Sequence, residues 1–302
     1  MTAPAREPNT FAAGPLDRAG PRRTDAAWLA RALEDPAARA VVGTAAGVLV
    51  DDGRPALVPA ARAAGVPGAG EPVFLGTDGA APVFAFDLER AGDAALDGLA
   101  AGARIAGLRD VAPQLTPADA GLLAYAAAEL NWQRRHRFCA NCGNPTASAE
   151  GGHLRVCPQC GAQHHPRTDP VVIMLVHAEG RVLLGRQATW PDKRYSALAG
   201  FVEPGESLEA AVAREVAEEA GVAVTDVTYR SSQPWPFPAS LMLGFWARWA
   251  GGEPTTRDDE LEDVRWFSGA ELRERRDGLK LPPPHAIARR LIDEWLAREA
   301  RA

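Results

Sequence analysis

Long hydrophobic runs and an excess of basic charge are both missing from this chain of 302 residues. The longest uninterrupted apolar runs, at residues 122–128 and 171–176, are far too short to span a bilayer. The formal net charge is -6, which argues against a protein that holds long nucleic acid by its overall charge. Residues 1–24 are rich in Pro, Gly, Ala and Arg and lack the apolar core of a signal peptide. We therefore expect a disordered tail over residues 1–24 and a cytoplasmic protein.

Cysteine is also scarce, and the four cysteines form two closely spaced pairs, Cys139 with Cys142 and Cys157 with Cys160. Each Cys-x-x-Cys pair places two thiolates on one side of a metal, and two pairs complete a tetrahedron around Zn²⁺ at about 2.3 Å per bond. Four thiolates leave no position for water, so the sequence predicts one structural zinc per chain. We expect a zinc ribbon over residues 136–168, a module that also occurs in nucleic-acid-binding proteins and so leaves the function open.

Two larger segments flank the cysteine segment. Residues 25–135 carry apolar runs broken by Gly, Asp and Pro and end in an Ala-rich helix, which predicts a smaller mixed α/β N-terminal domain. In residues 169–302, strand patterns alternate with helical ones, which indicates a layered α/β domain. The elements expected there are strands at 171–176, 181–186, 241–249 and 264–267, and helices at about 207–220 and 285–298. The chain as a whole is thus expected to be α+β.

The first of these helices is dense in carboxylates. At about 100° per residue, Glu215 and Glu219 lie within about 20° of Leu208, and Glu218 completes an arc of about 100°. Ala211 and other small apolar residues mark this arc as an inward or cleft-facing side, whereas a solvated acidic face would lie opposite them. Like charges at this spacing repel, and a divalent cation offsets the repulsion. Carboxylate oxygens suit Mg²⁺ or Mn²⁺.

The residues around these acids complete a longer pattern. Arg214 lies one turn before Glu218 and can orient the carboxylates, and Gly200 lies in the loop region where backbone can approach metal and phosphate. Every position of the Nudix box, G-x5-E-x7-R-E-U-x-E-E-x-G-U with U apolar, is matched by Gly200-x5-Glu206-x7-Arg214-Glu215-Val216-x-Glu218-Glu219-x-Gly221-Val222. The chain therefore resembles the Nudix hydrolases, which cleave nucleoside diphosphates linked to another group by means of divalent metals. The resemblance implies a Nudix α/β/α sandwich over residues 169–302.

A proline-rich segment follows, reading Ser-Ser-Gln-Pro-Trp-Pro-Phe-Pro-Ala-Ser over residues 231–240. Prolines that alternate with aromatics predict a rigid, extended loop with little entropy to lose on ordering. Trp235 and Phe237 offer flat surfaces for stacking, and Gln233 and Ser240 offer hydrogen bonds. On its residues alone, the segment fits a ligand site, a dimer contact or a packed core.

After a Nudix box, this segment is similar to the S-Q-P-W-P-F-P-x-S array of the NADH pyrophosphatase subfamily, and the four-cysteine segment and the residues at 281–292 agree with it. The resemblance covers residues 132–296 strongly. It implies cleavage of NADH or NAD to a nicotinamide mononucleotide and AMP, removal of NAD caps from RNA in some members, and homodimers in which the loop helps to complete the partner's site. The substrate contacts that it implies are Gln233, Pro234, Trp235, Pro236, Phe237, Pro238, Ala239, Ser240, Phe201, His165 and Ala288.

The same resemblance implies the ligands of the catalytic metals. Carried over by position, Glu215, Glu219, Glu260 and the backbone carbonyl of Ala199 would hold more than one Mg²⁺ or Mn²⁺ ion, and Glu218 would be a further ligand or the base. Without the match, the acidic run that contains Glu260 would be interpreted as a solvated loop.

The sequence differs from the subfamily pattern at one position, and one further residue outside the pattern is a candidate contact. A tyrosine is usual where His165 stands, which puts the affinity for the nicotinamide end in question. In the N-terminal domain, Arg109 is a further candidate for phosphate contact.

Two other functions stay open on the sequence. A Nudix enzyme could prefer ADP-ribose, a dinucleoside polyphosphate or NAD-capped RNA, and a zinc-ribbon regulator could bind a nucleotide without cleaving it. The complete set of box acids argues against the regulator, because a binding protein has no need of three carboxylates that repel one another. The basic run at residues 134–137 could contribute to an RNA-binding surface, although such short runs are usually just solvated.

Overall fold

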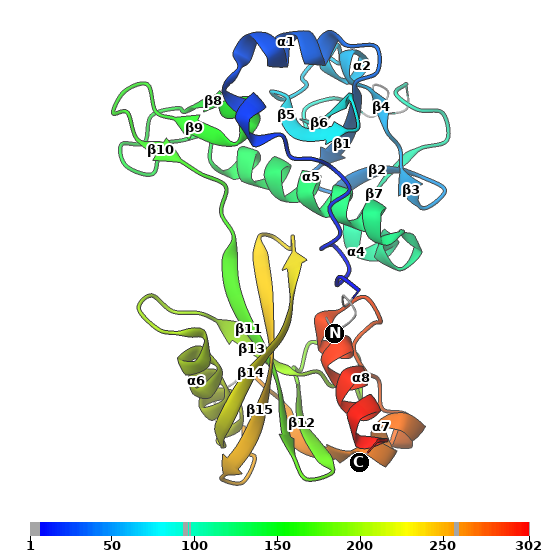
Figure 1. The fold of residues 1–302 in the computed structure, drawn as a ribbon, viewed down its shortest axis with the longest axis vertical. Coiled ribbons are helices and arrows are strands. Elements are labelled where there is room, and N and C mark those ends of the chain that lie inside the picture. The colour runs from blue at the N-terminus through cyan, green and yellow to red at the C-terminus, as the bar shows by residue number, and fades with distance from the viewer. Residues whose placement is uncertain (1–6, 93–95, 97, 257–259, 302) are drawn as a thin grey trace, which may run out of the picture. The chain divides into compact units, whose positions relative to one another are not determined.

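The computed structural model of the chain describes residues 7–92, 96, 98–256 and 260–301 (Figure 1). Internal contacts divide it into two units. The C-terminal unit consists of Met1–Thr10, Asp169–Pro234 and Ser240–Ala302, and the N-terminal unit consists of Phe11–Thr168 and Trp235–Ala239. Each unit therefore includes one short piece of chain that lies far from the rest of it in sequence.

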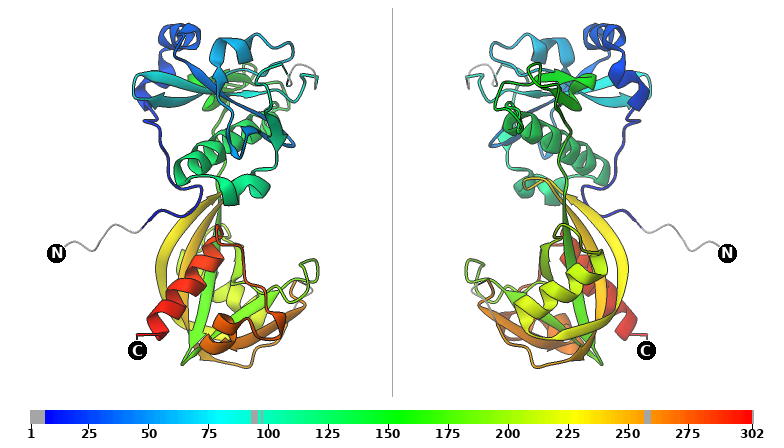
Figure 2. Two further views of the ribbon diagram at one scale, coloured as in Figure 1. Left: turned by 90° about the vertical axis from the view of Figure 1, so that its right-hand side faces the viewer. Right: turned by 90° about the vertical axis from the view of Figure 1, so that its left-hand side faces the viewer.

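The N-terminal unit is built on a seven-stranded sheet with helices on both faces (Figures 1 and 2). Its elements are η1 (Gly20–Thr24), α1 (Ala26–Glu34), β1 (Arg39–Thr44), β2 (Gly47–Asp51), β3 (Arg54–Pro55), β4 (Val58–Pro59), α2 (Ala60–Ala64), β5 (Val73–Asp78), β6 (Ala81–Asp87), β7 (Arg104–Ala106), α4 (Leu108–Val111), η2 (Ala112–Gln114) and α5 (Pro117–Arg135). The strand order is β3-β2-β1-β6-β5, with β4 paired to β1 and β7 paired to β2.

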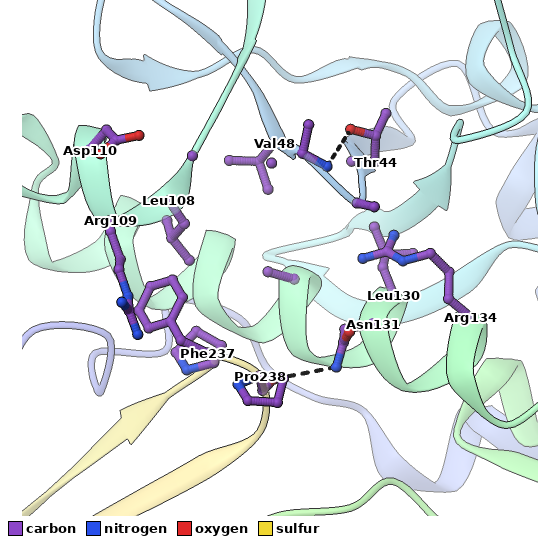
Figure 3. Close-up of a pocket in the computed structure, with 17 residues that line it drawn as sticks. Thr44, Val48, Leu108, Arg109, Asp110, Leu130, Asn131, Arg134, Phe237 and Pro238 are labelled. Carbon is purple, nitrogen blue, oxygen red and sulfur yellow. Dashed lines mark hydrogen bonds between the residues drawn. The ribbon is translucent and has the colours of Figure 1, made fainter. Parts of the chain in front are cut away.

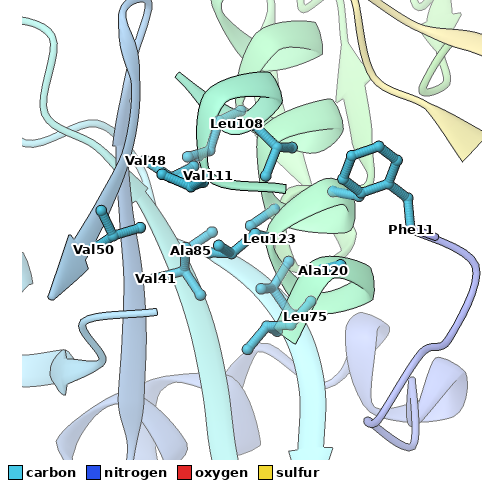
Figure 4. Close-up of a cluster of buried hydrophobic side chains, with 14 of the residues drawn as sticks. Phe11, Val41, Val48, Val50, Leu75, Ala85, Leu108, Val111, Ala120 and Leu123 are labelled. Carbon is cyan, nitrogen blue, oxygen red and sulfur yellow. The ribbon is translucent and has the colours of Figure 1, made fainter. Parts of the chain in front are cut away.

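Side chains of this sheet alternate between two apolar cores. Val41 of β1 packs with Leu123 of α5 on one face, shown in Figure 4. Its neighbours Ala40 and Val42 pack on the other face, together with Ala63 of α2. Because both faces are covered, the strands are apolar at consecutive positions, which explains why the sequence shows only weak alternation there.

The cysteine segment forms a small three-stranded sheet in the order β10-β9-β8. Its elements are β8 (Ala147–Ala149), η3 (Glu150–Gly152), β9 (Leu154–Val156) and β10 (Gln163–His164). A buried hydrogen bond of 2.7 Å from a ring nitrogen of His153 to the carbonyl oxygen of Phe74 ties this sheet to β5 within the same unit.

The C-terminal unit is a six-stranded sheet between helices, which is the expected α/β/α sandwich. Its elements are β11 (Asp169–Ala178), β12 (Arg181–Arg186), β13 (Leu198–Phe201), α6 (Leu208–Ala220), β14 (Ala223–Trp235), β15 (Ser240–Gly251), β16 (Asp263–Ser268), α7 (Gly269–Glu274), η4 (Arg276–Gly278) and α8 (Ile287–Glu299). Along β11, Val172 and Met174 face the core under α6, and Ile173 and Leu175 face the core under α7 and α8.

The two large sheets have the same topology. In both, the first strand pairs antiparallel with the second, as β1 with β2 and β11 with β12. In both it pairs parallel with a later strand, as β1 with β6 and β11 with β15, and antiparallel with a short third strand, β4 or β13. A helix follows that short strand in each unit, but α2 has 5 residues and α6 has 13. The chain thus contains one fold twice, with a reduced helix in the first copy.

Two parts of the structure differ from the expectations. From Glu7 onward the segment expected to be disordered has a defined structure. Asn9 and Phe11 are buried in it, because they contact core residues and hydrogen-bonding partners that are distant in sequence. β14 extends to Trp235, so the first half of the expected proline-rich loop is a strand. Residues 1–6 of the expected tail lie outside the described residues.

None of the helices in the described part of the chain has both the length and the apolar character that a bilayer crossing needs.

The close contact at Gly121 in α5 gives a test of this packing. A Cβ atom there would lie 1.7 Å from the carbonyl oxygen of Ala13. Alanine gains about 1 kcal/mol in helix propensity over glycine, but a collision with backbone in a packed site costs about 1–3 kcal/mol. We expect Gly121→Ala to lower the free energy of unfolding by about 1 kcal/mol in urea denaturation, the middle of the net range of about 0–2 kcal/mol. A more stable Gly121→Ala protein would contradict the packing of residue 13 on α5, and Ala128→Gly in the same helix measures the propensity effect alone.

Candidate active site on helix α6

Helix α6 has clear start and stop signals and an unusual buried face. The Ser207 hydroxyl accepts a hydrogen bond of 3.2 Å from the Ala210 backbone N–H, and Gly221 ends the helix in the left-handed conformation with φ 69°. Glu215 and Glu219 are buried on the same side as the apolar residues that pack on the sheet, with 8% and 3% of their surface exposed. The inward orientation predicted from the helical spacing is therefore present for these two acids.

Gly200 on β13 makes room for one of these carboxylates. A Cβ atom at residue 200 would lie 1.8–2.0 Å from the carboxyl atoms of Glu215. The absence of a side chain at this strand position is thus required by the carboxylate. The preceding residue, Ala199, pairs with Ile173 of β11, so its backbone is held in the sheet beside this carboxylate.

Arg214 connects the acids of the box. Its guanidinium donates two hydrogen bonds to Glu206, at 3.1 and 2.6 Å, and one each to Glu215 and Glu218, both at 2.9 Å. It also donates to the carbonyl oxygen of Phe201 at 2.9 Å. One cation therefore fixes three carboxylates and the end of β13, as expected for a residue that orients neighbouring ligands.

These contacts and the burial shift the proton affinities of the acids in opposite directions. The hydrogen bonds from Arg214 lower the pKa of Glu206. Burial raises the pKa of Glu215, Arg214 opposes the rise, and the charges of Glu218 and Glu260 add to it. A buried carboxylate next to further carboxylates favours the binding of a cation, because the positive charge of the cation offsets both the burial and the repulsion between the carboxylates.

Glu260 follows residues 257–259, which lie outside the described residues, and its own side chain is exposed. The chain after it is well anchored. The Leu261 side chain packs against Gly185 so closely that a Cβ atom on residue 185 would lie 2.8 Å from it. Glu262 forms an ion pair of 2.9 Å with Arg186.

A second anchor follows at Asp263, which accepts a hydrogen bond from the hydroxyl of Tyr195. Burial, together with this bond, raises the pKa of Tyr195 to about 12, so the phenol stays protonated and keeps donating. These supports join residues that are distant in sequence, and no sequence signal pointed to them.

The four cysteines lie together as expected. Their four sulfur atoms all lie within 4.8 Å of one another. The Sγ atoms of Cys139 and Cys160 are 3.6 Å apart and those of Cys142 and Cys157 are 3.5 Å apart. A tetrahedron with Zn–S bonds of about 2.3 Å has edges of about 3.8 Å, so the cluster fits a zinc ion closely.

Two thiols of the cluster are shifted in opposite directions. Hydrogen bonding from Asn144 lowers the pKa of the Cys142 thiol to about 6. Against backbone hydrogen bonds at Cys160 and Gln159, burial and the neighbouring thiols raise the pKa of the Cys157 thiol to about 11. A ring nitrogen of His164 lies 3.3 Å from the sulfur of Cys139, beside the four sulfurs.

The residues expected to bind substrate divide between the two units. The C-terminal unit contains Ala199, Phe201, Arg214, Glu215, Glu218, Glu219, Gln233, Pro234, Ser240, Glu260 and Ala288, and the N-terminal unit contains Arg109, His165, Trp235, Pro236, Phe237, Pro238 and Ala239. Phe201 is 59% exposed, while Ala288 is buried near the start of α8. His165 is exposed.

The aromatic residues of the loop are packed within the N-terminal unit. The rings of Trp235 and Phe237 lie edge to face at 5.1 Å, and Phe11 packs on both. The Arg109 guanidinium lies 4.4 Å from the centre of the Phe237 ring, as Figure 3 shows. In Figure 3, Phe237 and Pro238 border a cavity of about 430 Å³, and Asn131 donates to the carbonyl oxygen of Pro238 at 3.4 Å. Arg109 and the loop are therefore neighbours, which the sequence did not indicate.

Three consecutive family matches cover the chain. Residues 166–294 match the NUDIX domain, residues 134–164 match the NADH pyrophosphatase zinc ribbon domain, and residues 36–132 match the NADH pyrophosphatase-like rudimentary NUDIX domain. The last match agrees with the repeated topology and the reduced helix α2. Together with the carboxylates of α6, these matches define a Nudix-type enzyme.

Similar proteins are known in bacteria. The chain is 45% identical over 224 residues to the NAD-capped RNA hydrolase NudC of Stutzerimonas stutzeri, covering 74% of this chain and 77% of that one. It is 44% identical over 237 residues to the protein of the same name from Deinococcus radiodurans, covering 76% and 79%. A solved NUDIX hydrolase from Nitrosomonas europaea aligns with 55% of this chain and 93% of its own, with a TM-score of 0.46 and 22% identity. The chain belongs to the NADH pyrophosphatase branch of the Nudix hydrolase family.

The space at Gly200 gives a direct test of the carboxylate site. In Gly200→Ala the new methyl group displaces the Glu215 carboxylate, so we expect binding of Mn²⁺, measured by electron paramagnetic resonance, to weaken roughly tenfold or more. Gly20→Ala is the control, because a Cβ atom there meets nothing within 4 Å. Wild-type affinity for Mn²⁺ in Gly200→Ala would show that Glu215 is not a ligand.

Proposed function

We propose that this protein hydrolyses the pyrophosphate bond of NADH or NAD, giving a nicotinamide mononucleotide and AMP, and that it also removes NAD caps from RNA. The observation that carries the proposal is the buried pair Glu215 and Glu219 on α6, held beside Gly200 by the Arg214 network. The name of the two bacterial relatives, NAD-capped RNA hydrolase, supports the choice of substrate.

In this proposal the metal ligands are Glu215, Glu219, Glu260 and the carbonyl oxygen of Ala199. Their oxygens fit Mg²⁺ or Mn²⁺. Bound there, more than one such ion would supply positive charge against the phosphate oxygens and would acidify the water that hydrolyses the bond.

The protein's own groups then have distinct tasks. Arg214 holds Glu206, Glu215 and Glu218 in place before substrate arrives, so no side chain has to reorganise during the reaction. Glu218 has a half-exposed carboxylate, and we assign it as a further ligand or as the base that takes the proton of the water. The exposed ring of Phe201 offers a stacking surface for the nicotinamide or the adenine.

The remaining substrate contacts stay predictions of the resemblance. They are Pro234, Trp235, Pro236, Phe237, Pro238, Ala239, Ser240, His165 and Ala288, with Arg109 as a contact for phosphate. The homodimer, in which the loop serves the partner's site, also stays a prediction. We further propose a cytoplasmic location, since a thiolate cluster such as this one is compatible with a reducing compartment.

NADH turnover in the presence of Mg²⁺ or Mn²⁺ tests the reaction. Chromatography should give reduced nicotinamide mononucleotide and AMP in equal amounts. Glu219→Gln should lower kcat by roughly 10³-fold, because it removes a ligand of ions whose contribution is worth several kcal/mol. Glu209→Gln, an exposed acid in the first turn of the same helix, is the control and should leave kcat unchanged.

NADH, NAD, NAD-capped RNA and ADP-ribose should be compared side by side. Rapid cleavage of ADP-ribose with intact NADH would reject the proposed substrate and leave the family assignment in place. Full activity of Glu219→Gln would reject the metal assignment itself.

The zinc ribbon has a separate test. We expect elemental analysis of the reduced protein, purified without chelator, to give about one zinc per chain. Cys142→Ser should lose the zinc and become sensitive to proteolysis in the ribbon, because the metal supplies much of the stability of so small a sheet. Gln159→Ala, an exposed residue between two cysteines of the second pair, should keep both the zinc and the resistance. Wild-type protein without zinc would overturn the structural role of the metal.

A further inference from the structure

The side chain of Gln233 is fully buried and all its bonding partners belong to the C-terminal unit. Its amide nitrogen donates to the carbonyl oxygen of Thr10 at 2.9 Å and to that of His285 at 2.7 Å. Its amide oxygen accepts from the backbone N–H of Ile287 at 2.8 Å. Both donor hydrogens and the oxygen are thus used, and they tie together three segments that are distant in sequence.

The bond to Ile287 satisfies the start of a helix. Ile287 is the first residue of α8, and Ala286 before it has no side chain that could cap the helix. The first backbone N–H groups of a helix have no partner within it, and a buried one without a partner is costly. Gln233 therefore acts as the missing cap from a strand far away in sequence.

The N-terminal segment is fixed at the same place. Asn9 donates from its amide to the carbonyl oxygen of Ser232, the residue before Gln233, at 2.7 Å. One guanidinium nitrogen of Arg290 donates to the carbonyl oxygen of Glu7 at 2.7 Å and to the side-chain oxygen of Asn9 at 3.0 Å. Residues 7–10 thus lie across the end of β14 and the first turn of α8.

We propose that Gln233 is a positioning residue, and that with Asn9 and Arg290 it forms an intramolecular clamp that sets the start of α8. A direct contact of Gln233 with substrate would require its amide to leave three backbone groups, in one buried bond to Ile287 and two partly buried bonds to Thr10 and His285. A buried group left without a partner costs about 1–3 kcal/mol, so this exchange is unfavourable.

The clamp matters for substrate binding through Ala288, a point that rests on the proposed function. Ala288 directly follows Ile287 in the first turn of α8 and is expected to line the nucleotide pocket. None of the hydrogen bonds of the clamp involves Glu215, Glu218 or Glu219 of α6. Loosening the clamp should therefore weaken substrate binding and leave the chemical step unchanged.

Two variants and their controls test the clamp. For NADH hydrolysis we expect Gln233→Ala to raise KM about tenfold and Asn9→Ala about threefold, with kcat within about twofold of wild type. Glu7→Ala is the control for Asn9, because Glu7 contributes only its backbone oxygen. Since both variants act on the same helix start, the double variant should raise KM by less than the product of the single effects.

Hydrogen exchange in the protein without substrate gives a second readout. The Ile287 amide should exchange about tenfold faster in Gln233→Ala, while amides of α6 keep the wild-type rate. Asn9→Ala, which removes a single side chain at the edge of the clamp, keeps the test valid if Gln233→Ala does not fold.

Three results would overturn the proposal. One is an increased KM for Gln233→Ala with wild-type exchange at Ile287 and an inert Asn9→Ala, which would make Gln233 a direct ligand. Another is a loss of kcat at constant KM, and the third is no change in any measurement. If the wild-type protein does not cleave NADH, the proposed function fails, and the exchange rates still decide whether the clamp exists.

Discussion

The burial of two carboxylates on one helix is the constraint on which the candidate site depends. Glu215 and Glu219 are among the few buried charged residues of the described chain, and burial of an acid is unfavourable unless opposite charge and hydrogen bonds compensate. Arg214 supplies part of that charge and joins the helix to the end of β13. Gly200 supplies the space. The strand, the loop and the helix of the Nudix box are therefore one structural unit whose parts have little freedom to vary independently.

The repeated fold separates the elements that support the sheet from the helix that carries the candidate site. Both units pair their first strand antiparallel with the second strand and parallel with a later one. In the N-terminal copy the equivalent helix, Ala60–Ala64, is a single short turn without a carboxylate. Its sheet nevertheless retains cores on both faces, against α5 on one side and α1 and α2 on the other. The first copy therefore keeps the scaffold and lacks the catalytic helix.

The sequence predicted the features that depend on local spacing. The position of α6 at about 207–220 and the convergence of the four cysteines follow from patterns within a short stretch of sequence, and the sandwich of the C-terminal unit follows from the resemblance to the Nudix family. It did not predict β13 or the burial of Gln233, because these depend on partners distant in sequence, such as Ile173 for Ala199 and Ile287 for Gln233. It also did not predict that Ser231–Gln233 lie in β14, which pairs with the next strand, β15. The proline-rich pattern correctly indicates an extended backbone, but an extended backbone fits a strand as well as a loop.

The interleaving of the two units has a consequence for how the protein is made. Asn9 binds Arg290, a residue 281 positions later in the chain. At a synthesis rate of about 5–20 residues per second, the N-terminal segment waits roughly 14–56 s on the ribosome for its partner to emerge. During that time the N-terminal sheet can complete its own core, except for the loop Trp235–Ala239, which also arrives late. The bonds between residues 7–9 and Arg290 therefore form among the last steps of folding. The start of α8 is complete only after α8 has been synthesised.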